Sequence, residues 1–404
     1  MALTAYLLGT HTQADSLAVA VGPLDAINSV LINTMVFAFV PMLTGQRGPA
    51  RTALFLQLNK YFVRLFSALT LGIVLCAPWL IRILAPGLDP NYYHTATTIL
   101  RIVAFSTLAA GAAAINCALL YTDRRFAPFA FYQASLNLFT VIGALAFWSL
   151  LGVYGFAIGY TMGAWAQFAV VHFFARRGLQ TKDLPPSEVH WREILARPVT
   201  ISLYAVSLAL NTVFTRAWAT HAGPGMAAAM DYCMRGVGVP LVFLVSPISN
   251  SLLPELARLR SQSHLRQAFR LIDKTLALAA LAAVGACAFA IVFREPAIAI
   301  LFQRGNFTAE STRLVSAVYL GLAPSMIGWA LLELTGRALF ALDRPWLPLA
   351  ASAIPVVFNV LLTFWLGSSK PQLIGVGASA GLMAGFLVLF LAAHLSRKRW
   401  MRIP

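Results

Sequence analysis

The sequence contains an internal repeat that relates its second half to its first. The turn at 121–124, followed by Pro128, corresponds to the turn at 341–344, followed by Pro348. Further positions match at similar offsets: Gly155, Gly159, Gly163, Phe168, His172 and Arg177 correspond to Gly377, Gly381, Gly385, Phe390, His394 and Arg399. The offsets lie between about 213 and 222 residues, the shortest joining Pro41 to Pro254. In an apolar chain, such a repeat predicts two membrane-embedded halves that enclose a site and move against each other, as in transporters.

Apolar segments long enough to cross a bilayer occur along the whole chain. Hydrophobic residues make up 59% and charged residues 11% of the 404 positions, which excludes a water-soluble domain. We expect an all-α polytopic membrane protein, because a helix of about 20 residues crosses the hydrocarbon core and leaves no backbone group unpaired. The eleven expected spans are 14–43, 62–84, 97–121, 127–151, 153–174, 199–221, 226–253, 268–293, 311–336, 347–366 and 373–395.

The repeat predicts two lobes of six helices each, related as a parallel repeat, with the first helix incomplete. The N-terminal lobe covers 1–177, a cytoplasmic linker covers 178–198, and the C-terminal lobe covers 199–404. The C-terminal lobe opens with a full span, whereas only Met1–Leu8 precede the equivalent position in the N-terminal lobe. This segment is too short to cross a bilayer. We expect that the first helix has been lost or, as the favoured alternative, that translation starts about 15 residues further upstream, which would complete a span.

The net charge of +16 is distributed asymmetrically along the chain. The connections at 85–96, 294–310 and 367–372 hold only Arg294, Arg304 and Lys370 as basic residues. The alternate connections are rich in arginine and lysine, at 47–64, 124–125, 176–197, 258–274, 337–344 and 397–402. This positive-inside pattern predicts a cytoplasmic C-terminus. We expect the basic loops to contact anionic lipid headgroups, and no nucleic acid.

The sequence contains no pattern that indicates catalysis. The four cysteines lie inside expected spans without metal-ligand or disulfide spacing: Cys76, Cys117, Cys233 and Cys287. Phosphate-binding loops, His/Glu metal spacings and nucleophile elbows are also absent from the sequence. We therefore expect no enzyme, no cofactor and no metal site. Transport would draw on the membrane potential or on an ion gradient, with Na⁺ or H⁺ as the coupling ion.

Several segments, in chain order, resemble motifs of the MurJ (MviN) family of lipid II flippases. Residues 301–308 resemble the family's periplasmic F-x-x-G-x-F-T loop, and 337–343 resemble its R-A-F-Y-A-L-x-D motif, one residue shorter here. Three further stretches resemble the second-helix signature, the end of the third helix and the Pro-containing end of the eighth: 14–16 with 38–43, 77–80 with 85–87, and 251–256. The resemblance covers nearly the whole chain. It extends to a superfamily that includes oligosaccharide-lipid flippases and multidrug antiporters.

The resemblance implies a V-shaped, alternating-access transporter of the bacterial cytoplasmic membrane. Its expected substrate is a lipid-linked, phosphate-bearing saccharide, which is lipid II or a related polysaccharide precursor. Membrane lipid and enzymes of cell-wall or polysaccharide synthesis are the expected partners. The family's last two helices, which form a groove for the lipid tail, have no counterpart here, so the length of the lipid stays open. Two alternatives remain: an ion-coupled multidrug-type antiporter with cavity carboxylates, and a non-transporting membrane scaffold.

A phosphate-bearing headgroup requires cations in the cavity, because burying its charge without compensation is costly. The chain departs from the family at these positions. Of the Asp-Arg pair in the family's eighth helix, only the arginine is present here, as Arg235. Glu333 occupies the position of the family's tenth-helix lysine. The family's second-helix arginine pair corresponds to positions near 27–29, which hold Ile, Asn and Ser. Ionisable residues inside spans are candidates for substrate binding. They are Arg235, Asp15, Arg216, Asp25, Glu333 and Asp231.

Each of several candidates also has a purely structural explanation. Asp15 could cap its helix, Glu333 could pair with Arg337 one turn away, and Asp231 could pair with Arg235. Two uncharged residues inside spans, Asn359 and Asn211, are weaker candidates for cation binding. Asn359 matches a position where some family members place a cation ligand, but hydrogen bonding between helices is the simpler interpretation.

Overall fold

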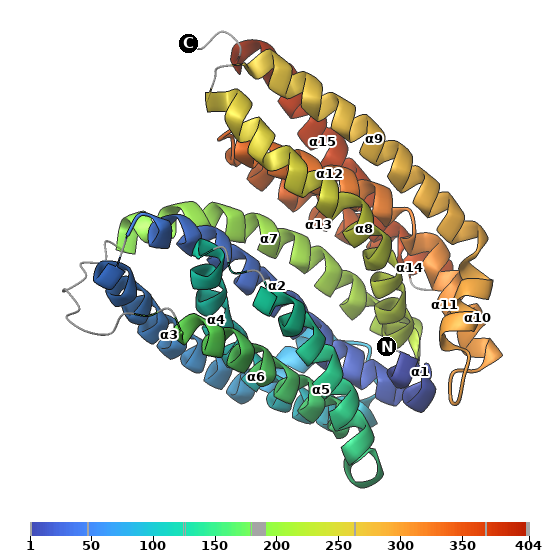
Figure 1. Ribbon diagram of the computed structural model, residues 1–404. Helices are drawn as coiled ribbons and strands as arrows, with labels where there is room; N and C mark the ends of the chain where they lie inside the picture. The colour runs from blue at the N-terminus through green and yellow to red at the C-terminus, as the bar shows by residue number, and fades with distance from the viewer. Residues whose placement is uncertain are drawn as a thin grey trace. The chain divides into compact units, whose positions relative to one another are not determined.

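The computed structural model describes residues 2–46, 48–123, 125, 127–177, 179, 191–261, 264–367 and 370–400. Within these ranges every regular element is a helix (Figure 1). The α-helices are α1 (Ala2–Leu8), α2 (Thr12–Thr44), α3 (Gly48–Leu84), α4 (Tyr93–Thr122), α5 (Ala127–Leu151), α6 (Tyr154–Arg176), α7 (Trp191–Ala219), α8 (Met226–Ser261), α9 (Leu265–Val292), α10 (Arg294–Phe302), α11 (Ala309–Leu322), α12 (Ser325–Ala341), α13 (Trp346–Leu366), α14 (Pro371–Ile374) and α15 (Val376–Trp400). Two short 3-10 helices, η1 (Pro90–Tyr92) and η2 (Thr220–Ala222), precede α4 and α8.

The expected all-helical fold is confirmed. Most expected spans fall on one helix. The exceptions are 311–336, which is divided between α11 and α12 with axes that differ by 43°, 373–395, which begins in α14 and continues in α15, and 199–221, which runs from α7 into η2. Pro324 lies at the break between α11 and α12, where its ring and its missing N–H interrupt the helix. Six of the described helices are long and apolar enough to cross a membrane, or seven if the bent pair forms one span. The total of eleven spans stays a prediction.

The chain divides into two compact units, which are Thr12–Val206 and Ser207–Pro404 together with Met1–His11. These differ in two respects from the lobes drawn from the sequence, and the first is that α1 belongs with the C-terminal unit. The second is that the boundary at 206 falls within α7. Of the linker expected at 178–198, residues 191–198 form the start of α7 and 179 is described, while 178 and 180–190 lie outside the described residues.

In the Thr12–Val206 unit, α4 is the central helix. It packs against α2, α3 and α6, and α5 packs against α6. Alanine or glycine occupies each of the positions 109–114 of α4, and all six are buried, which lets the neighbouring helices approach closely. The ring of Phe66 on α3 uses this space, since a Cβ added to Gly111 would lie 2.0 Å from it. Phe39, Leu58 and Phe62 extend the same buried cluster.

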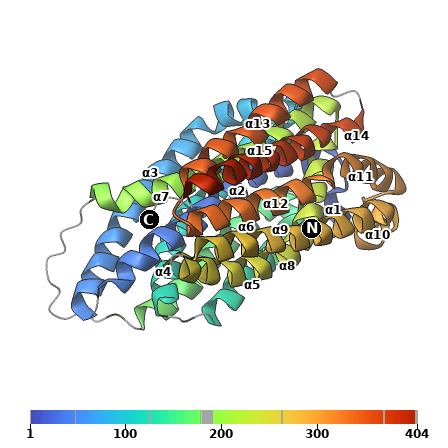
Figure 2. The same cartoon turned by 90° about the horizontal axis from the view of Figure 1, so that it is seen from above.

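In the Ser207–Pro404 unit, α12 is the central helix. It packs against α8, α9 and α15, and α13 packs against α15, as Figure 2 also shows. The core between these helices is built from large aliphatic side chains, including Leu256, Ile272, Leu332, Leu339 and Leu389. Polar side chains that are buried in this unit therefore bond to one another or to backbone carbonyls, as Ser379 does to the carbonyl of Gly321.

The sequence repeat returns as a repeat of helix packing. The pairs α5/α6, α4/α6 and α3/α4 in one unit correspond to α13/α15, α12/α15 and α9/α12 in the other. Phe168 stacks on His172 with ring centroids 4.9 Å apart, and their equivalents Phe390 and His394 also stack, at 6.1 Å. The repeated glycines at 155, 159 and 163 and at 377, 381 and 385 pack helix against helix. A Cβ on Gly381, for example, would lie 2.4 Å from a carbonyl oxygen of α13.

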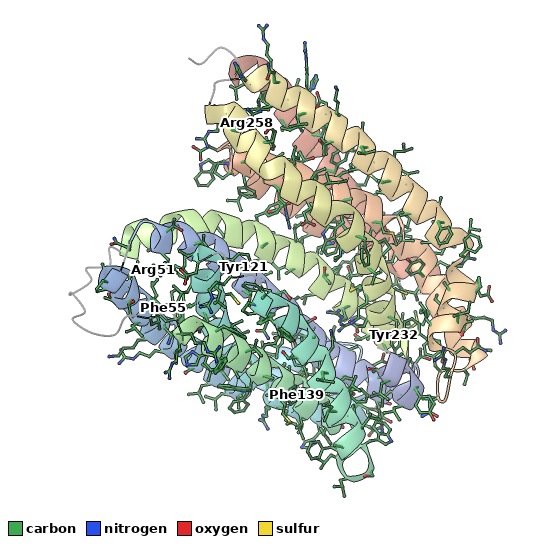
Figure 3. All side chains as sticks on the ribbon, viewed as in Figure 1. Arg51, Phe55, Tyr121, Phe139, Tyr232 and Arg258 are labelled. Carbon is green, nitrogen blue, oxygen red and sulfur yellow. The ribbon has the colours of Figure 1, made fainter. Side chains whose placement is uncertain are left out.

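The short helix α1 is fastened to the loop that follows α10. The backbone N–H of Asn306 donates to the carbonyl of Tyr6 (2.9 Å), and the Asn306 side-chain amide donates to the carbonyl of Leu7 (2.7 Å). Just beyond α1, the hydroxyl of Tyr232 donates to the carbonyl of Gly9 at 3.1 Å; Tyr232 is labelled in Figure 3. These bonds explain why residues 1–11 group with the C-terminal unit.

The aspartates of the repeated turns form matching ion pairs. Asp123, after α4, accepts from Arg51 of α3 at 2.7 Å, and Arg51 is labelled in Figure 3. Asp343, after α12, accepts from Arg260 of α8 at 2.9 Å. Each unit therefore ties this turn to a neighbouring helix.

Candidate functional site

Three of the charged residues predicted from the sequence form one cluster where α7 ends and α8 begins. Arg216 of α7 donates from Nη2 to Oδ1 of Asp231 on α8 at 2.6 Å. Arg235, one turn further along α8, donates from Nε to the other oxygen, Oδ2, at 3.1 Å. The 3.6-residue period of α8 places 231 and 235 on one face, so that a single carboxylate serves two arginines.

Within the described ranges, two guanidinium groups share the carboxylate of Asp231, so these three side chains together carry one excess positive charge. Arg216 is only 6% exposed, whereas the side chain of Arg235 is 45% exposed. The Nε and Nη1 atoms of Arg216 are buried and have no hydrogen-bond acceptor among the described residues. A buried donor without an acceptor costs about 1–3 kcal/mol. An anionic oxygen placed at either nitrogen would supply the missing acceptor.

A cavity of about 260 Å³ lies within the same unit, among α7, α8, α12 and α15. Its polar wall is formed by Asn211, Thr212 and Thr215 of α7 and by Ser325 and Glu333 of α12. The remainder of the lining is mostly apolar and includes Trp329, Val237, Leu241 and Leu382. Glu333 is the one charged residue among the described residues that line it.

The carboxylate of Glu333 is held from two sides within α12. Trp329 donates its indole N–H to Oε2 at 3.0 Å, and Arg337 approaches Oε1 at 2.5 Å. These residues lie one turn before and one turn after Glu333. The pairing with Arg337 predicted from the spacing is therefore present, and the indole contact was not predicted from the sequence.

Asn211 and Asn359 belong to a buried network of amides and hydroxyls. Asn359 donates from its side-chain nitrogen to Asn211 Oδ1 (2.9 Å) and to Thr215 Oγ1 (2.8 Å), and it accepts from Thr363 (2.9 Å). This is the hydrogen bonding between helices that the sequence suggested as the simpler interpretation. Close packing of Gly377 encloses the network, since a Cβ there would lie 2.1 Å from Thr363 Oγ1. The weaker suggestion of a cation at these amides stays a prediction.

The other two candidates lie in the Thr12–Val206 unit. Asp25 of α2 accepts a hydrogen bond from the hydroxyl of Tyr160 on α6 at 2.8 Å. Asp15 lies in the first turn of α2 and is buried. Its position in the first turn agrees with a favourable interaction with the helix dipole, and its role in substrate binding stays a prediction.

The structure thus brings six of the eight predicted residues into two places. Arg216, Asp231 and Arg235 form the ionic cluster. Asn211 and Glu333 line the cavity, and Asn359 joins its wall through Asn211. Asp15 and Asp25 belong to neither place. Sequence reasoning missed the hydroxyls of the wall, Trp329 and Tyr160. A signal existed for two of them, because Thr215 and Trp329 lie one helical turn from Asn211 and Glu333, on the same helix faces.

Comparison with known proteins identifies the family. The family model "Lipid II flippase MurJ" matches residues 4–403. The "Probable lipid II flippase MurJ" of Rhizobium meliloti (strain 1021) is 27% identical over 395 residues, which cover 90% of this chain and 71% of the relative. The "Lipid II flippase MurJ" of Burkholderia cenocepacia is 24% identical over 330 residues, covering 75% of this chain and 62% of the relative. The chain is therefore shorter than both relatives.

Solved structures share the fold at low sequence identity. A lipid II flippase MurJ in an inward closed conformation aligns with a TM-score of 0.84 at 17% identity, covering 99% of this chain and 86% of that one. An inward-facing multidrug resistance MATE family transporter of the MOP superfamily aligns with a TM-score of 0.86 at 12% identity, covering 100% and 94%. These structures show the fold of a multi-pass membrane protein, and the family match confirms the resemblance found in the motifs. The chain belongs to the MurJ family of lipid II flippases.

Proposed function

We propose that this chain moves a lipid-linked, phosphate-bearing saccharide, lipid II or a close relative, across the bacterial cytoplasmic membrane, with its C-terminus on the cytoplasmic side. Family membership and the names of the relatives support the substrate class. The alternation of basic and non-basic loops supports the orientation. The observation that carries the proposal is Arg216, a buried arginine with two side-chain nitrogens that have no acceptor within the described part of the chain.

The ionic cluster has the chemistry that a lipid phosphate needs. Phosphate oxygens accept strong charge-assisted hydrogen bonds from guanidinium groups. Asp231 holds both arginines in place while leaving the cluster with one excess positive charge. The cluster would therefore compensate a phosphate during its passage, and alternating access of the two units would expose it first to one side and then to the other.

The arrangement also explains how the chain can differ from the family's cation pattern. Arg235 is the one cation of the family pattern that sequence reasoning could place, and the aspartate that precedes this arginine in the family is replaced by Met234. Asp231 lies one turn earlier on α8 and supplies a carboxylate to the same arginine. We infer that Arg216, contributed by α7, makes up part of the positive charge lost elsewhere.

The proposal is tested by complementation in a bacterium whose own lipid II flippase is depleted. Expression of this chain should restore growth and the appearance of labelled lipid II headgroup at the outer face of the membrane. Arg216→Gln should remove both, whereas Arg258→Gln, a matched change of an exposed arginine on α8, should remove neither. The proposal would be overturned if the chain, present at normal level in the membrane, restored neither growth nor surface lipid II. Efflux of a cationic dye by the same cells would then favour the multidrug antiporter.

A further inference from the structure

The cavity beside α12 has the opposite electrostatic character to the ionic cluster. Glu333 supplies the formal negative charge of its described lining, and no described lysine, arginine or histidine lines it. A phosphate would be repelled here, because a like charge at short range in a medium of low dielectric is unfavourable. The two places therefore suit ligands of opposite charge.

The ion pair of Glu333 is oriented with its negative end toward the cavity. Glu333 lines the cavity and its side chain is 24% exposed, whereas Arg337 does not line the cavity and its side chain is 37% exposed. The indole N–H of Trp329 fixes the second carboxylate oxygen. Each carboxylate oxygen accepts more than one hydrogen bond, so both retain acceptor capacity for a further donor.

The rest of the wall adds acceptors and an aromatic ring. Thr212, Thr215 and Ser325 contribute hydroxyl oxygens, and Asn211 contributes an amide. The ring of Trp329 lines the same space, and an indole face attracts cations. At about 260 Å³ the cavity lies just below the roughly 300–1,000 Å³ typical of sites for drug-sized ligands. It therefore suits one flexible aliphatic chain with a single polar end.

We propose that this cavity is a binding site for a primary alkylammonium group, such as that of a lysine side chain. The ammonium would donate to Glu333 and to neighbouring hydroxyl oxygens, and its aliphatic stem would lie against Trp329 and the apolar part of the lining. The site is independent of the proposed phosphate cluster, because it uses different side chains and the opposite charge.

The probe for this site is Nα-acetyl-lysine methylamide, which carries one ammonium group. Its binding to the purified full chain, in nanodiscs of phosphatidylcholine, is measured by isothermal titration calorimetry. The neutral analogue Nα-acetyl-norleucine methylamide should bind at least about tenfold more weakly, because it lacks the charged hydrogen bonds. Nanodiscs that contain phosphatidylethanolamine test the source of the amine. Weaker probe binding there would assign the site to a lipid ammonium, and unchanged binding would assign it to an amine that is not lipid.

Two variants make the test specific to Glu333. Glu333→Gln should weaken the lysine probe by about tenfold or more and leave the norleucine analogue unchanged. If this variant is unstable because the ion pair between Glu333 and Arg337 is lost, the double variant Glu333→Gln with Arg337→Gln removes both charges and should show the same loss of probe binding. Glu310→Gln, an exposed change in the first turn of α11, is the control and should bind like the wild type. Equal binding of both probes to the wild type, or full binding to the folded double variant, would overturn the proposal. Loss of lipid II translocation without loss of probe binding would affect only the proposed function.

Discussion

Arg216 donates a hydrogen bond of 2.6 Å to Asp231, and this bond joins the end of α7 to the start of α8. Sequence spacing alone suggested a simpler pair of Asp231 with Arg235. The third member changes the energetics, because the carboxylate balances a buried arginine as well as a half-exposed one. Removing Asp231 therefore leaves a buried charge without compensation, which is the costly way to break an ion pair.

We expect Asp231→Asn to destabilise the protein by about 3–5 kcal/mol, the usual cost of breaking a buried pair. The double change of Asp231 and Arg235 to alanine should be no better tolerated, because Arg216 remains buried and unpaired. Thermal melting in detergent micelles measures the effect. Glu255→Gln is the control, since Glu255 pairs with Arg258 on the exposed surface of α8 and should shift the melting temperature little. Equal melting temperatures for Asp231→Asn and the control Glu255→Gln would contradict the buried role of Asp231.

The amide network depends on the absence of a side chain at Gly377. We expect Gly377→Ala to lower the melting temperature, because its Cβ would lie 2.1 Å from Thr363 Oγ1 and 2.6 Å from Asn359 Oδ1. Gly285→Ala on α9 is the matched control, because no atom lies within 4 Å of its added Cβ. Alanine favours a helix interior by up to about 1 kcal/mol over glycine, so this control should be neutral or stabilising. A melting temperature of Gly377→Ala above that of the wild type would contradict the close packing of the amide network against Gly377.

The attachment of α1 predicts a local change in amide exchange. Asn306→Ala removes the side-chain donor to the Leu7 carbonyl, so Ala2–Leu8 should exchange hydrogen faster. Gly225→Ala should act similarly, because its Cβ would lie 2.1 Å from the Thr10 carbonyl oxygen. Gly223 also has a positive φ but lies in open space, so Gly223→Ala controls for backbone strain. Hydrogen-exchange mass spectrometry would contradict the attachment if Asn306→Ala and Gly225→Ala both exchanged at the wild-type rate.

The loop charges predict on which side of the membrane each connection lies. Single cysteines at Gln303 and at His264 should react with a membrane-impermeant maleimide from opposite sides, with Gln303 outside. The background is Cys76→Ser, because Cys76 is exposed while Cys117, Cys233 and Cys287 are buried. Solubilised protein should label at both sites. Labelling of both from the same face of intact cells would contradict the proposed orientation.

Much of the fold could be predicted from the sequence, because its signals are periodic and local. Apolar length located the helices, and the repeated turns at 121–124 and 341–344 located equivalent ends of the two units. The break at Pro324 was missed, since apolar length does not record helix direction. The grouping of residues 1–11 with the C-terminal unit was also missed, because it depends on contacts with Asn306 and Tyr232, which are distant in sequence.

The candidate site could be predicted only in part. Charges inside spans are conspicuous, so Arg216, Asp231 and Glu333 were found from the sequence. Which of them meet was predictable only along one helix, as for Glu333 with Arg337. The contact of Arg216 with Asp231 joins two helices, and the hydroxyls of the cavity wall resemble any others in an apolar span. The Arg216–Asp231 contact and the cavity hydroxyls could be identified only once the packing of α7 against its neighbouring helices was known.

The central claim is that the two arginines on Asp231 compensate a lipid phosphate, and translocation by the purified chain in vesicles tests it most directly. Arg216→Gln and Arg235→Ala each leave Asp231 paired with the remaining arginine, so both variants should stay folded while the excess positive charge is lost. We expect each to lose translocation of fluorescent lipid II, and Arg235→Lys to recover part of it, because a lysine restores the charge without the planar fork. Arg258→Gln should translocate normally. Wild-type rates in folded Arg216→Gln and Arg235→Ala proteins would contradict the account.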